Sequence, residues 1–391
     1  MEEKLRKIKN DREVDFILIV LVTILVTFGV VMVFSASYYD SIYADGTPYS
    51  FLKKQAFFAV TGFVMMMIIS HVDYHIICKG SNLIAGAEIL MLLAVLFTPL
   101  GVEVNGAKRW LSLGLVNFTI MPGEIAKLAV IVLAATIFAK NKEKVKNLSG
   151  LMPVVLYTAV VCLLILKQPN LSTAVTVAAI AVGIAFLAGM QWRYVALMGA
   201  GGIGLVFYVV AKVREAMAAD EELGYQLRRI VCFLDPFKFE DDEGFQVVQS
   251  LLALGTGGIK GTGLGMSVQK NLYLPEPQND FILAIIGEEL GFLGIAAVMI
   301  VFVVLVWRIL MVAVESKDAL GTLLAGGVAI MIGVQVLFNI AVVTSSMPPT
   351  GVALPFISYG GNAIWIMMWL MGIVLNISRQ TQPATAKNKK E

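Results

Sequence analysis

The chain has 391 residues, of which 58% are hydrophobic and only 15% are charged, and its mean hydropathy is +0.81. Ordinary soluble domains carry roughly 25% charged residues, whereas residues 319–378 contain no Asp, Glu, Lys or Arg at all. This composition excludes soluble enzymes, disordered chains and nucleic-acid-binding proteins, and the net charge of +2 is too small to indicate a polyanionic partner. The sequence therefore predicts an all-α polytopic membrane protein.

Ten segments are long and apolar enough to be membrane-spanning helices, each of which needs about 20 predominantly apolar residues. In chain order the predicted spans are residues 15–36, 51–70, 80–99, 119–139, 148–166, 171–190, 194–211, 281–306, 319–342 and 359–377. The last two are separated at SSMPPTGVALP, because paired prolines cannot continue a helix. No small-residue cleavage site leading into a soluble domain follows the first span, so we expect it to be retained as an anchor. We expect residues 1–378 to form a single membrane domain, with a polar cytoplasmic tail at 379–391.

The distribution of Lys and Arg predicts the orientation of the spans, because short cytoplasmic loops are enriched in these residues. An even number of spans places both termini on one side. That side holds seventeen Lys and Arg residues, against five in the short loops of the other side. Both termini are therefore predicted to be cytoplasmic. The one long loop, about residues 212–280, is then extracytoplasmic, and within it residues 247–255 predict a short apolar helix at or in the membrane surface.

Glu124 and Lys127 are two ionisable residues within the fourth predicted span, where charge is costly and therefore suggests a function. They lie three positions apart and so share one face of the helix. One interpretation is an ion pair that allows a buried helix to carry two charges. The other is a pair facing an outward-opening cavity that binds a charged group of a substrate. The spacing leaves both open.

Lys108, Arg109 and Trp110 are adjacent in the extracytoplasmic segment NGAKRWLSLG. Tryptophan and basic residues are common at membrane interfaces, which favours an anchoring role. Adjacent cations beside an aromatic ring also suit a phosphate-bearing lipid head group or a sugar ring. The spacing does not decide between these two roles.

Asp280 lies at the outer end of the eighth predicted span, in NLYLPEPQNDFILAIIGEELG. A carboxylate at a helix start caps free N–H groups and is favoured by the helix dipole, and capping is the more frequent role. An Asp held ionised in that position is also a rigidly placed proton acceptor. Glu288 and Glu289 follow two turns later. At most one of them can point at Asp280, and we expect the other to pair with a neighbouring helix or with backbone.

Two other patterns do not indicate a cofactor. The glycine-rich stretch at residues 255–265 lacks the GK[ST] of a phosphate-binding loop, so we expect no nucleotide. His71 and His75 have a spacing compatible with a metal, but no further ligand is evident in the sequence, which favours a solvated or helix-ending role.

Seven segments, taken together, resemble the successive motifs of the SEDS family, the FtsW, RodA and SpoVE group. They are NGAKRWLSLG, PGEIAKLA, KQPNLSTA, FLDPF, GTGGIKGTGLG, NLYLPEPQNDFILAIIGEELG and PPTGVALPFISYGG. The resemblance covers nearly the whole chain in order, and IGEELG and AVVT are more similar to the FtsW and SpoVE branch than to RodA. It implies an inverting glycosyltransferase that polymerises lipid II into peptidoglycan strands at the outer face of the bacterial cytoplasmic membrane and releases undecaprenyl diphosphate.

The resemblance also implies roles for single residues. Asp280 matches the Asp that is essential for polymerisation in the family, and Trp110 matches the Trp of a GAxRW motif. Glu124 and Lys127 match the charged pair of a PSExAK motif, in which Gly123 here replaces the usual Ser. We expect Asp280 to act as the base or as a ligand of a divalent cation, Mg or Mn.

We expect Lys108, Arg109 and Lys127 to contact the diphosphate of the substrate. The sequence departs from the family at Asn170 and Ser172, where the family commonly has the Asp and Gly of a QPDLGTA motif. This departure argues against an acid or metal-ligand role at position 170.

The resemblance implies a class B penicillin-binding protein as the crosslinking partner, together with divisome proteins, and a location at the division septum. Three alternatives stay open. The first is a flippase for lipid II, although no internal repeat of the kind common in transporters is visible. The second is the same activity in elongation or in spore cortex synthesis, and the third is a scaffold without catalysis.

Overall fold

The computed structural model of the protein describes residues 14–104, 106–112, 119–218, 233, 236–239, 244–349 and 351–381. Within these residues a long helix stands at each of the ten predicted spans. The ten are α2 (Phe16–Ala36), α4 (Ser50–Ile69), α6 (Ser81–Phe97), α7 (Pro122–Lys140), α8 (Leu148–Lys167), α9 (Leu171–Leu187), α10 (Trp192–Ala218), α13 (Ile282–Glu315), α14 (Ala319–Val343) and α15 (Gly361–Gln380). In the described part of the chain, seven of them are long and apolar enough to cross a membrane, and α6 and α9 are apolar helices of 17 residues. The protein is an all-α polytopic membrane protein, as expected.

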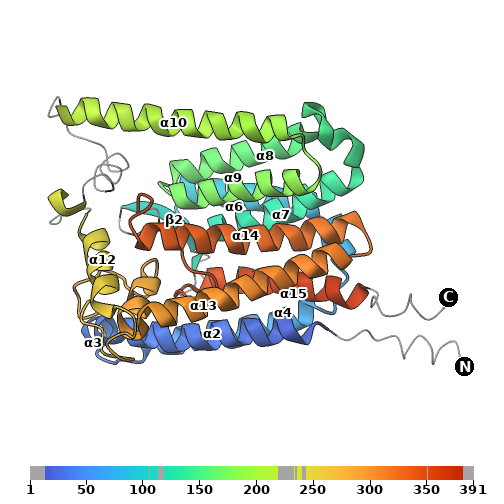
Figure 1. The fold of residues 1–391 in the computed structure, drawn as a ribbon. Helices are drawn as coiled ribbons and strands as arrows, with labels where there is room; N and C mark the ends of the chain where they lie inside the picture. The colour runs from blue at the N-terminus through green and yellow to red at the C-terminus, as the bar shows by residue number, and fades with distance from the viewer. Residues whose placement is uncertain are drawn as a thin grey trace, which may run out of the picture.

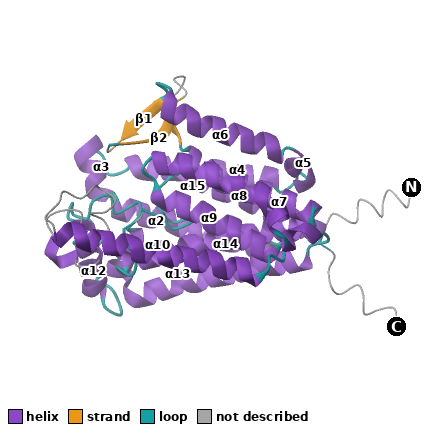
Figure 2. Cartoon of the chain, turned by 90° about the horizontal axis from the view of Figure 1, so that it is seen from above, coloured by secondary structure: helices purple, strands orange, loops and turns teal. Residues whose placement is uncertain are grey.

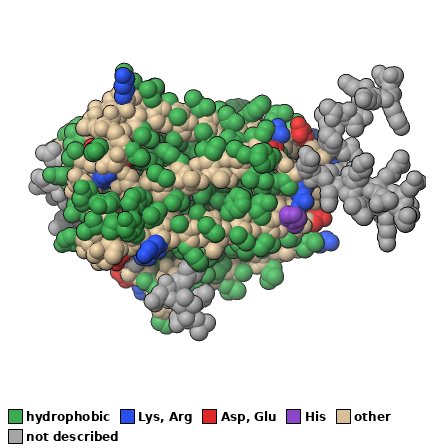
Figure 3. Space-filling view, turned by 90° about the horizontal axis from the view of Figure 1, so that it is seen from below, with side chains coloured by type: hydrophobic (Ala, Val, Ile, Leu, Met, Phe, Trp, Pro, Cys, Tyr) green, Lys and Arg blue, Asp and Glu red, His purple; other side chains and the backbone are tan. Residues whose placement is uncertain are grey.

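The long helices run alongside one another and leave two distinct ends (Figure 1). One end carries α3 (Tyr38–Asp45), a small sheet and α12 (Phe245–Gly257), and is called the sheet end below (Figure 2). The other carries α5 (Tyr74–Lys79) and both ends of the described chain, and is called the terminus end. Between the two ends the surface is largely covered by apolar side chains, while charged side chains gather toward the ends (Figure 3). This distribution is what a bilayer requires of the protein that spans it.

The helices differ in how deeply they are buried. In α7, α14 and α15, 72%, 61% and 67% of the most apolar stretch is buried, whereas α4, α8 and α13 bury less than a third of theirs. The interior of α7 is apolar on every side, in LAVIVLAATIF, and a helix of that kind belongs inside a bundle. It packs against α6, α9 and α14. Its first turn therefore stands among other helices at the sheet end.

Helices from the two ends of the chain pack against each other. Both α2 and α4, near the N-terminus, contact helices near the C-terminus, α13 and α15 respectively. The buried Gln55 of α4 donates from Nε2 to the carbonyl of Ser358, at 3.2 Å. At the terminus end, Asp15 forms an ion pair with Arg308 of α13 at 2.6 Å, and its N–H donates to the Ser378 hydroxyl at 3.4 Å. The start of the first helix and the end of the last helix thus lie on the same side, as an even number of spans requires.

A three-stranded antiparallel sheet, which the sequence pattern does not predict, stands between α6 and α7. Its strands are β1 (Gly101–Val104), β2 (Ala107–Ser112) and β3 (Thr119–Ile120), in the order β1-β2-β3. The predicted span 119–139 is therefore too long at its start, because residues 119 and 120 belong to β3. Pro122 occupies the first turn of α7, where the missing N–H of proline costs no hydrogen bond.

The glycine-rich stretch after α12 explains a kink in α13. Gly291 has φ 68° and ψ −169°, so α13 consists of a short outer segment, 282–290, and a long helix that continues to Glu315. The N–H groups of Thr262 and Gly263 donate to the carbonyls of Glu288 and Glu289, both at 2.9 Å. The stretch therefore satisfies carbonyls that the kink leaves without helical partners. The expected apolar helix at 247–255 is confirmed as α12. Of the expected tail, residues 382–391 lie outside the described part.

Candidate functional site

Asp280 immediately precedes the outer segment of α13 at the sheet end. The N-cap position of the helix is Phe281, which makes no side-chain cap hydrogen bond, so Asp280 lies one position before the cap. Asp280 is half-buried. Its carbonyl accepts from Nδ2 of Asn339 on α14 at 2.8 Å, and a Cβ placed on Gly351 would lie 2.9 Å from its Oδ2. The carboxylate thus lies directly against the proline turn between α14 and α15.

The start of α9 touches the same turn from the other side. Ser172 donates from Oγ to the carbonyl of Gly351 at 3.4 Å and to Oδ1 of Asn170 at 3.0 Å. Asn170 is the N-cap of α9, because its Oδ1 accepts from the N–H of Thr173 at 3.2 Å. An amide oxygen performs this capping without any charge. The structure thus gives Asn170 a capping role.

Glu124 and Lys127 stand in the first turns of α7, beside the start of α9. Lys127 Nζ lies 2.8 Å and 2.7 Å from the two carboxylate oxygens of Glu124, and the side chains of Lys127 and Glu124 are only 4% and 12% exposed. A Cβ on the neighbouring Gly123 would lie 3.2 Å from Cγ2 of Thr173 on α9. The ion pair that the spacing allowed is therefore formed, and it is buried close to the turn that carries Asn170.

The three residues of the NGAKRWLSLG segment lie on β2 and have different surroundings. Arg109 donates from Nε to the carbonyl of Gln168 at 3.3 Å and from Nη2 to that of Pro169. It thereby ties β2 to the turn before α9. Lys108 is exposed, while Trp110 is half-buried and pairs in register with Val102 of β1. The structure brings Arg109 to the segment of Asn170 and leaves the ammonium of Lys108 accessible.

The described residues contain no group of three His, Cys, Asp or Glu side chains close enough to hold a metal ion. Protein side chains alone therefore do not form a cation site at Asp280. One carboxylate at an accessible position does fit the way Mg²⁺ is commonly bound, by one or two carboxylates together with phosphate oxygens of a substrate. The donor set fits a cation that arrives with a diphosphate.

One residue that holds the site, Asn339, was not found from the sequence, whereas at least one of Glu288 and Glu289 was expected to pair with a neighbouring helix or with backbone. Asn339 joins the carbonyls of Asp280 and Val352, at 2.8 Å and 2.7 Å. Glu288 and Glu289 both bind the loop before Asp280: Glu288 accepts from backbone N–H groups, and Glu289 pairs with Lys270. For Asn339 no signal was available, since its partners are backbone carbonyls far away in the chain.

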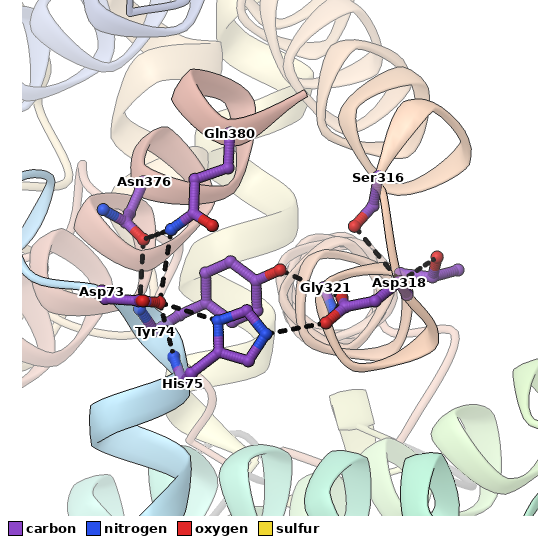
Figure 4. Close-up of polar contacts among 9 residues, drawn as sticks. Asp73, Tyr74, His75, Ser316, Asp318, Gly321, Asn376 and Gln380 are labelled. Carbon is purple, nitrogen blue, oxygen red and sulfur yellow. Dashed lines mark hydrogen bonds and ion pairs between the residues drawn. The ribbon is translucent and has the colours of Figure 1, made fainter. Parts of the chain in front are cut away.

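His75 at the terminus end is more constrained than the sequence suggested (Figure 4). Its ring lies between Asp73, with Nδ1 at 2.7 Å from Oδ1, and Asp318, with Nε2 at 2.8 Å from Oδ2. Partial burial disfavours the charged imidazole, but the two carboxylates outweigh it and raise the pKa of His75. The side chain of His75 is 42% exposed, and it joins α5 to Asp318, the N-cap residue of α14.

Known proteins match nearly the whole length of the chain. A family model described as cell cycle protein, for FtsW, RodA and SpoVE, matches residues 15–383. A probable peptidoglycan glycosyltransferase FtsW from Geobacter sp. (strain M18) is 39% identical over 95% of this chain and 98% of its own. The stage V sporulation protein E of Bacillus subtilis (strain 168) is 35% identical over 94% and 98%.

Solved structures are similar in fold. A chain in a structure titled as structural coordination of polymerization and crosslinking by a peptidoglycan synthase complex superposes with a TM-score of 0.74, at 25% identity, over 94% of this chain and 98% of its own. The crystal structure of the rod shape determining protein RodA of Thermus thermophilus gives 0.67, at 24% identity, over 95% and 99%. From the match of the family model and these relatives, this chain belongs to the FtsW, RodA and SpoVE family of cell cycle proteins.

Proposed function

We propose that this protein is a peptidoglycan glycosyltransferase that polymerises lipid II. One observation carries the proposal: at the sheet end, Asp280 lies against Gly351, which is bonded through Ser172 to the start of α9, next to the buried pair on α7. An acid, buried and exposed cations and turn backbone from distant segments thus gather at one boundary of the bundle. Relatives at 35% to 39% identity carry the glycosyltransferase and sporulation names given above.

The chemistry needs an acceptor, a donor and a base. A sugar hydroxyl of one lipid-linked chain attacks the anomeric carbon of another, and the bond from that carbon to the diphosphate oxygen breaks with its electron pair. The hydroxyl proton passes to the carboxylate of Asp280, and the anomeric configuration is inverted. Undecaprenyl diphosphate leaves from the opposite face, and its lipid tail stays against the apolar helices.

The leaving diphosphate requires nearby positive charge. The exposed ammonium of Lys108 is free of the constraints that hold its neighbours, since Arg109 is committed to two carbonyls and Lys127 to Glu124. We therefore assign the first contact with the diphosphate to Lys108. Arg109 and Lys127 would contribute positive charge from more buried positions. Trp110 would lie beside the sugar or the lipid head group. In the alternative role, Asp280 would hold a divalent cation, Mg or Mn, which would supply further neutralisation of the leaving diphosphate.

The orientation and the partners belong to the same proposal. The excess of Lys and Arg on the terminus side supports a cytoplasmic terminus end, which makes the sheet end extracytoplasmic. The partner would be a class B penicillin-binding protein that crosslinks the strands, in line with the polymerization and crosslinking named for the similar complex. Divisome proteins at the septum would then control when the pair is active.

The test is polymerisation of fluorescent lipid II by the purified protein with its penicillin-binding partner and Mg²⁺, read as glycan strands on a gel. Asp280→Ala and Asp280→Asn should abolish strands without changing thermal unfolding. Asp45→Asn, which alters an exposed aspartate at the same end, is the matched control and should polymerise normally. Full polymer from Asp280→Ala would refute the role of Asp280 as base.

A flippase is the second candidate, and the observation that favours it is the buried Glu124–Lys127 pair among the helices. Reconstituted vesicles with labelled lipid II distinguish the two. Translocation of lipid II without strand formation would favour the flippase. Strands without translocation would favour the polymerase. A second experiment locates the labelled protein in cells. A location at the septum, the side wall or the forespore would indicate division, elongation or sporulation, respectively.

A further inference from the structure

A buried ion pair holds the far end of the short helix segment 282–290 that follows Asp280. Lys270 Nζ lies 2.8 Å from Glu289 Oε1, and the side chains are 4% and 0% exposed. Ser35 of α2 joins both, because its hydroxyl donates to Glu289 Oε1 at 2.7 Å and accepts from Lys270 Nζ at 3.0 Å. Ser35, Lys270 and Glu289 are called the clamp below.

Glu288 holds the turn just before Lys270. Its carboxylate accepts from the hydroxyl of Ser267, from the N–H of Val268 at 2.9 Å and from the N–H of Gln269 at 3.3 Å. Hydrogen bonds to an ionised acceptor are the stronger kind. The two adjacent acids thus hold neighbouring parts of the same loop. Glu288 binds the backbone of the turn, and Glu289 binds the ammonium that follows it.

The clamp closes the base of a chain segment whose middle carries the proposed base. Lys270 and Glu289 are nineteen positions apart, and Asp280 lies near the midpoint. On one side, nine helical residues form a rod of about 13 Å. On the other side, Pro275 and Pro277 restrict the backbone. A displacement at the clamp would therefore reach Asp280 through the helix on one side and through the turn that contains the two prolines on the other.

Other contacts hold the middle of the segment from different helices. Asn339 of α14 binds the carbonyl of Asp280, and the N–H of Tyr359 donates to the carbonyl of Gln278 at 2.9 Å. These contacts keep the backbone of Asp280 against the bundle. The direction from which the segment approaches is set at its base, where Ser35 connects it to α2.

We propose that Lys270 and Glu289 are positioning residues for glycosyl transfer, which fix the place of the Asp280 carboxylate relative to the acceptor hydroxyl. This rests on the proposed function of Asp280. Stability is a poor reason for the pair, because replacing a buried ion pair by apolar residues is often neutral. Its position at the base of the segment that carries Asp280 gives it a function that apolar residues do not supply.

The experiment compares the double variant Lys270→Met/Glu289→Met, which removes both charges at similar volume, with the conservative Lys270→Arg. The control is Asp15→Asn/Arg308→Met, which removes the ion pair at the opposite end of the bundle. Steady-state polymerisation of lipid II gives kcat and KM separately, and thermal unfolding in detergent reports folding. We expect the clamp double variant to unfold like wild type but to lose about tenfold or more in kcat, as a small misplacement of a catalytic group does. KM should change little, and Lys270→Arg should keep most of the activity.

A folded double variant with wild-type kcat would overturn the inference and leave the clamp a packing feature. So would an equal loss of kcat in the control. If the double variant does not fold, hydrogen exchange of residues 268–281 in Ser35→Ala decides: faster exchange there with a lower kcat supports positioning, and unchanged exchange and kcat overturn it. Absence of polymer from the wild-type protein would instead count against the proposed function.

Discussion

Removal of one charge from the Glu124–Lys127 pair is expected to cost far more stability than removal of both. The side chains are 12% and 4% exposed, and two carboxylate oxygens lie within 2.8 Å of the ammonium. Lys127→Met leaves a buried carboxylate without its cation, which costs about 3 to 5 kcal/mol for buried pairs. Lys127→Met/Glu124→Gln removes both charges and should return to within about 1 kcal/mol of wild type.

The chain contains a matched control for this cycle. Glu143 and Lys146 have the same spacing, but they are 94% and 62% exposed and 3.9 Å apart. An exposed pair of this kind contributes about 0.5 kcal/mol or less, so Lys146→Met should be nearly silent. The assay is unfolding of the purified protein in detergent, by denaturant and by heat. A cost below about 1 kcal/mol for Lys127→Met would refute the reasoning, since the pair would then be hydrated rather than buried.

The same variants separate the two interpretations of the pair that the spacing left open. If the double variant folds and polymerises with an unchanged KM for lipid II, the pair serves only the fold. A raised KM in a folded double variant would show that Lys127 also meets the diphosphate. Because Lys127 is 4% exposed, we expect the larger effect on KM from Lys108→Met, whose ammonium is accessible.

Three further outcomes are expected. The raised pKa of His75 means that the protonated ring stabilises the folded state fully below its ordinary pKa of 6.5, and that this contribution is lost as the pH rises through the raised value. The thermal unfolding midpoint of wild type should therefore decrease as the pH rises above 6.5, and that of His75→Gln should decrease less; equal profiles would refute the link. Gly351→Ala adds a Cβ at φ +76° and 2.9 Å from Asp280 Oδ2, so polymerisation should drop about tenfold, and normal kcat would show that the carboxylate can move aside. Arg109→Lys loses the guanidinium that donates to two carbonyls, so the free energy of unfolding should fall by about 1 to 3 kcal/mol and hydrogen exchange in β2 should become faster. Unchanged exchange would contradict the link between β2 and the turn before α9.

The spans could be predicted from the sequence because hydropathy is a local property. Pro122 and the proline turn near Gly351 also mark ends that any helix must respect. The sheet was missed because β1 and β2 are short strands with charged residues, stabilised by pairing with each other rather than by their own composition. The kink was missed for a similar reason: the sequence shows Gly291 as one glycine among many, and only the approach of the glycine-rich stretch requires its positive φ.

The candidate site was predictable where function depends on residue type and less so where it depends on contact. Asp280 stands out as an acid at a membrane boundary. Lys270 does not, because it is one of several charges in a long loop, and only the folded structure places it against Glu289. The residue type of Asn170 also leaves its role open, and only the hydrogen bond from the N–H of Thr173 defines it as a helix cap.

The packing of α2 and α4 against α13 and α15 means that the first helices to be synthesised find their partners only among the last. The first helices enter the membrane before their partners are synthesised. The polar side chains of Ser35 and Gln55 are therefore in the membrane before Glu289 and Ser358 can bind them. A ribosome that stalls before α13 leaves both side chains without these partners. The buried polar groups of the earliest helices are therefore fully paired only after translation has passed residue 358.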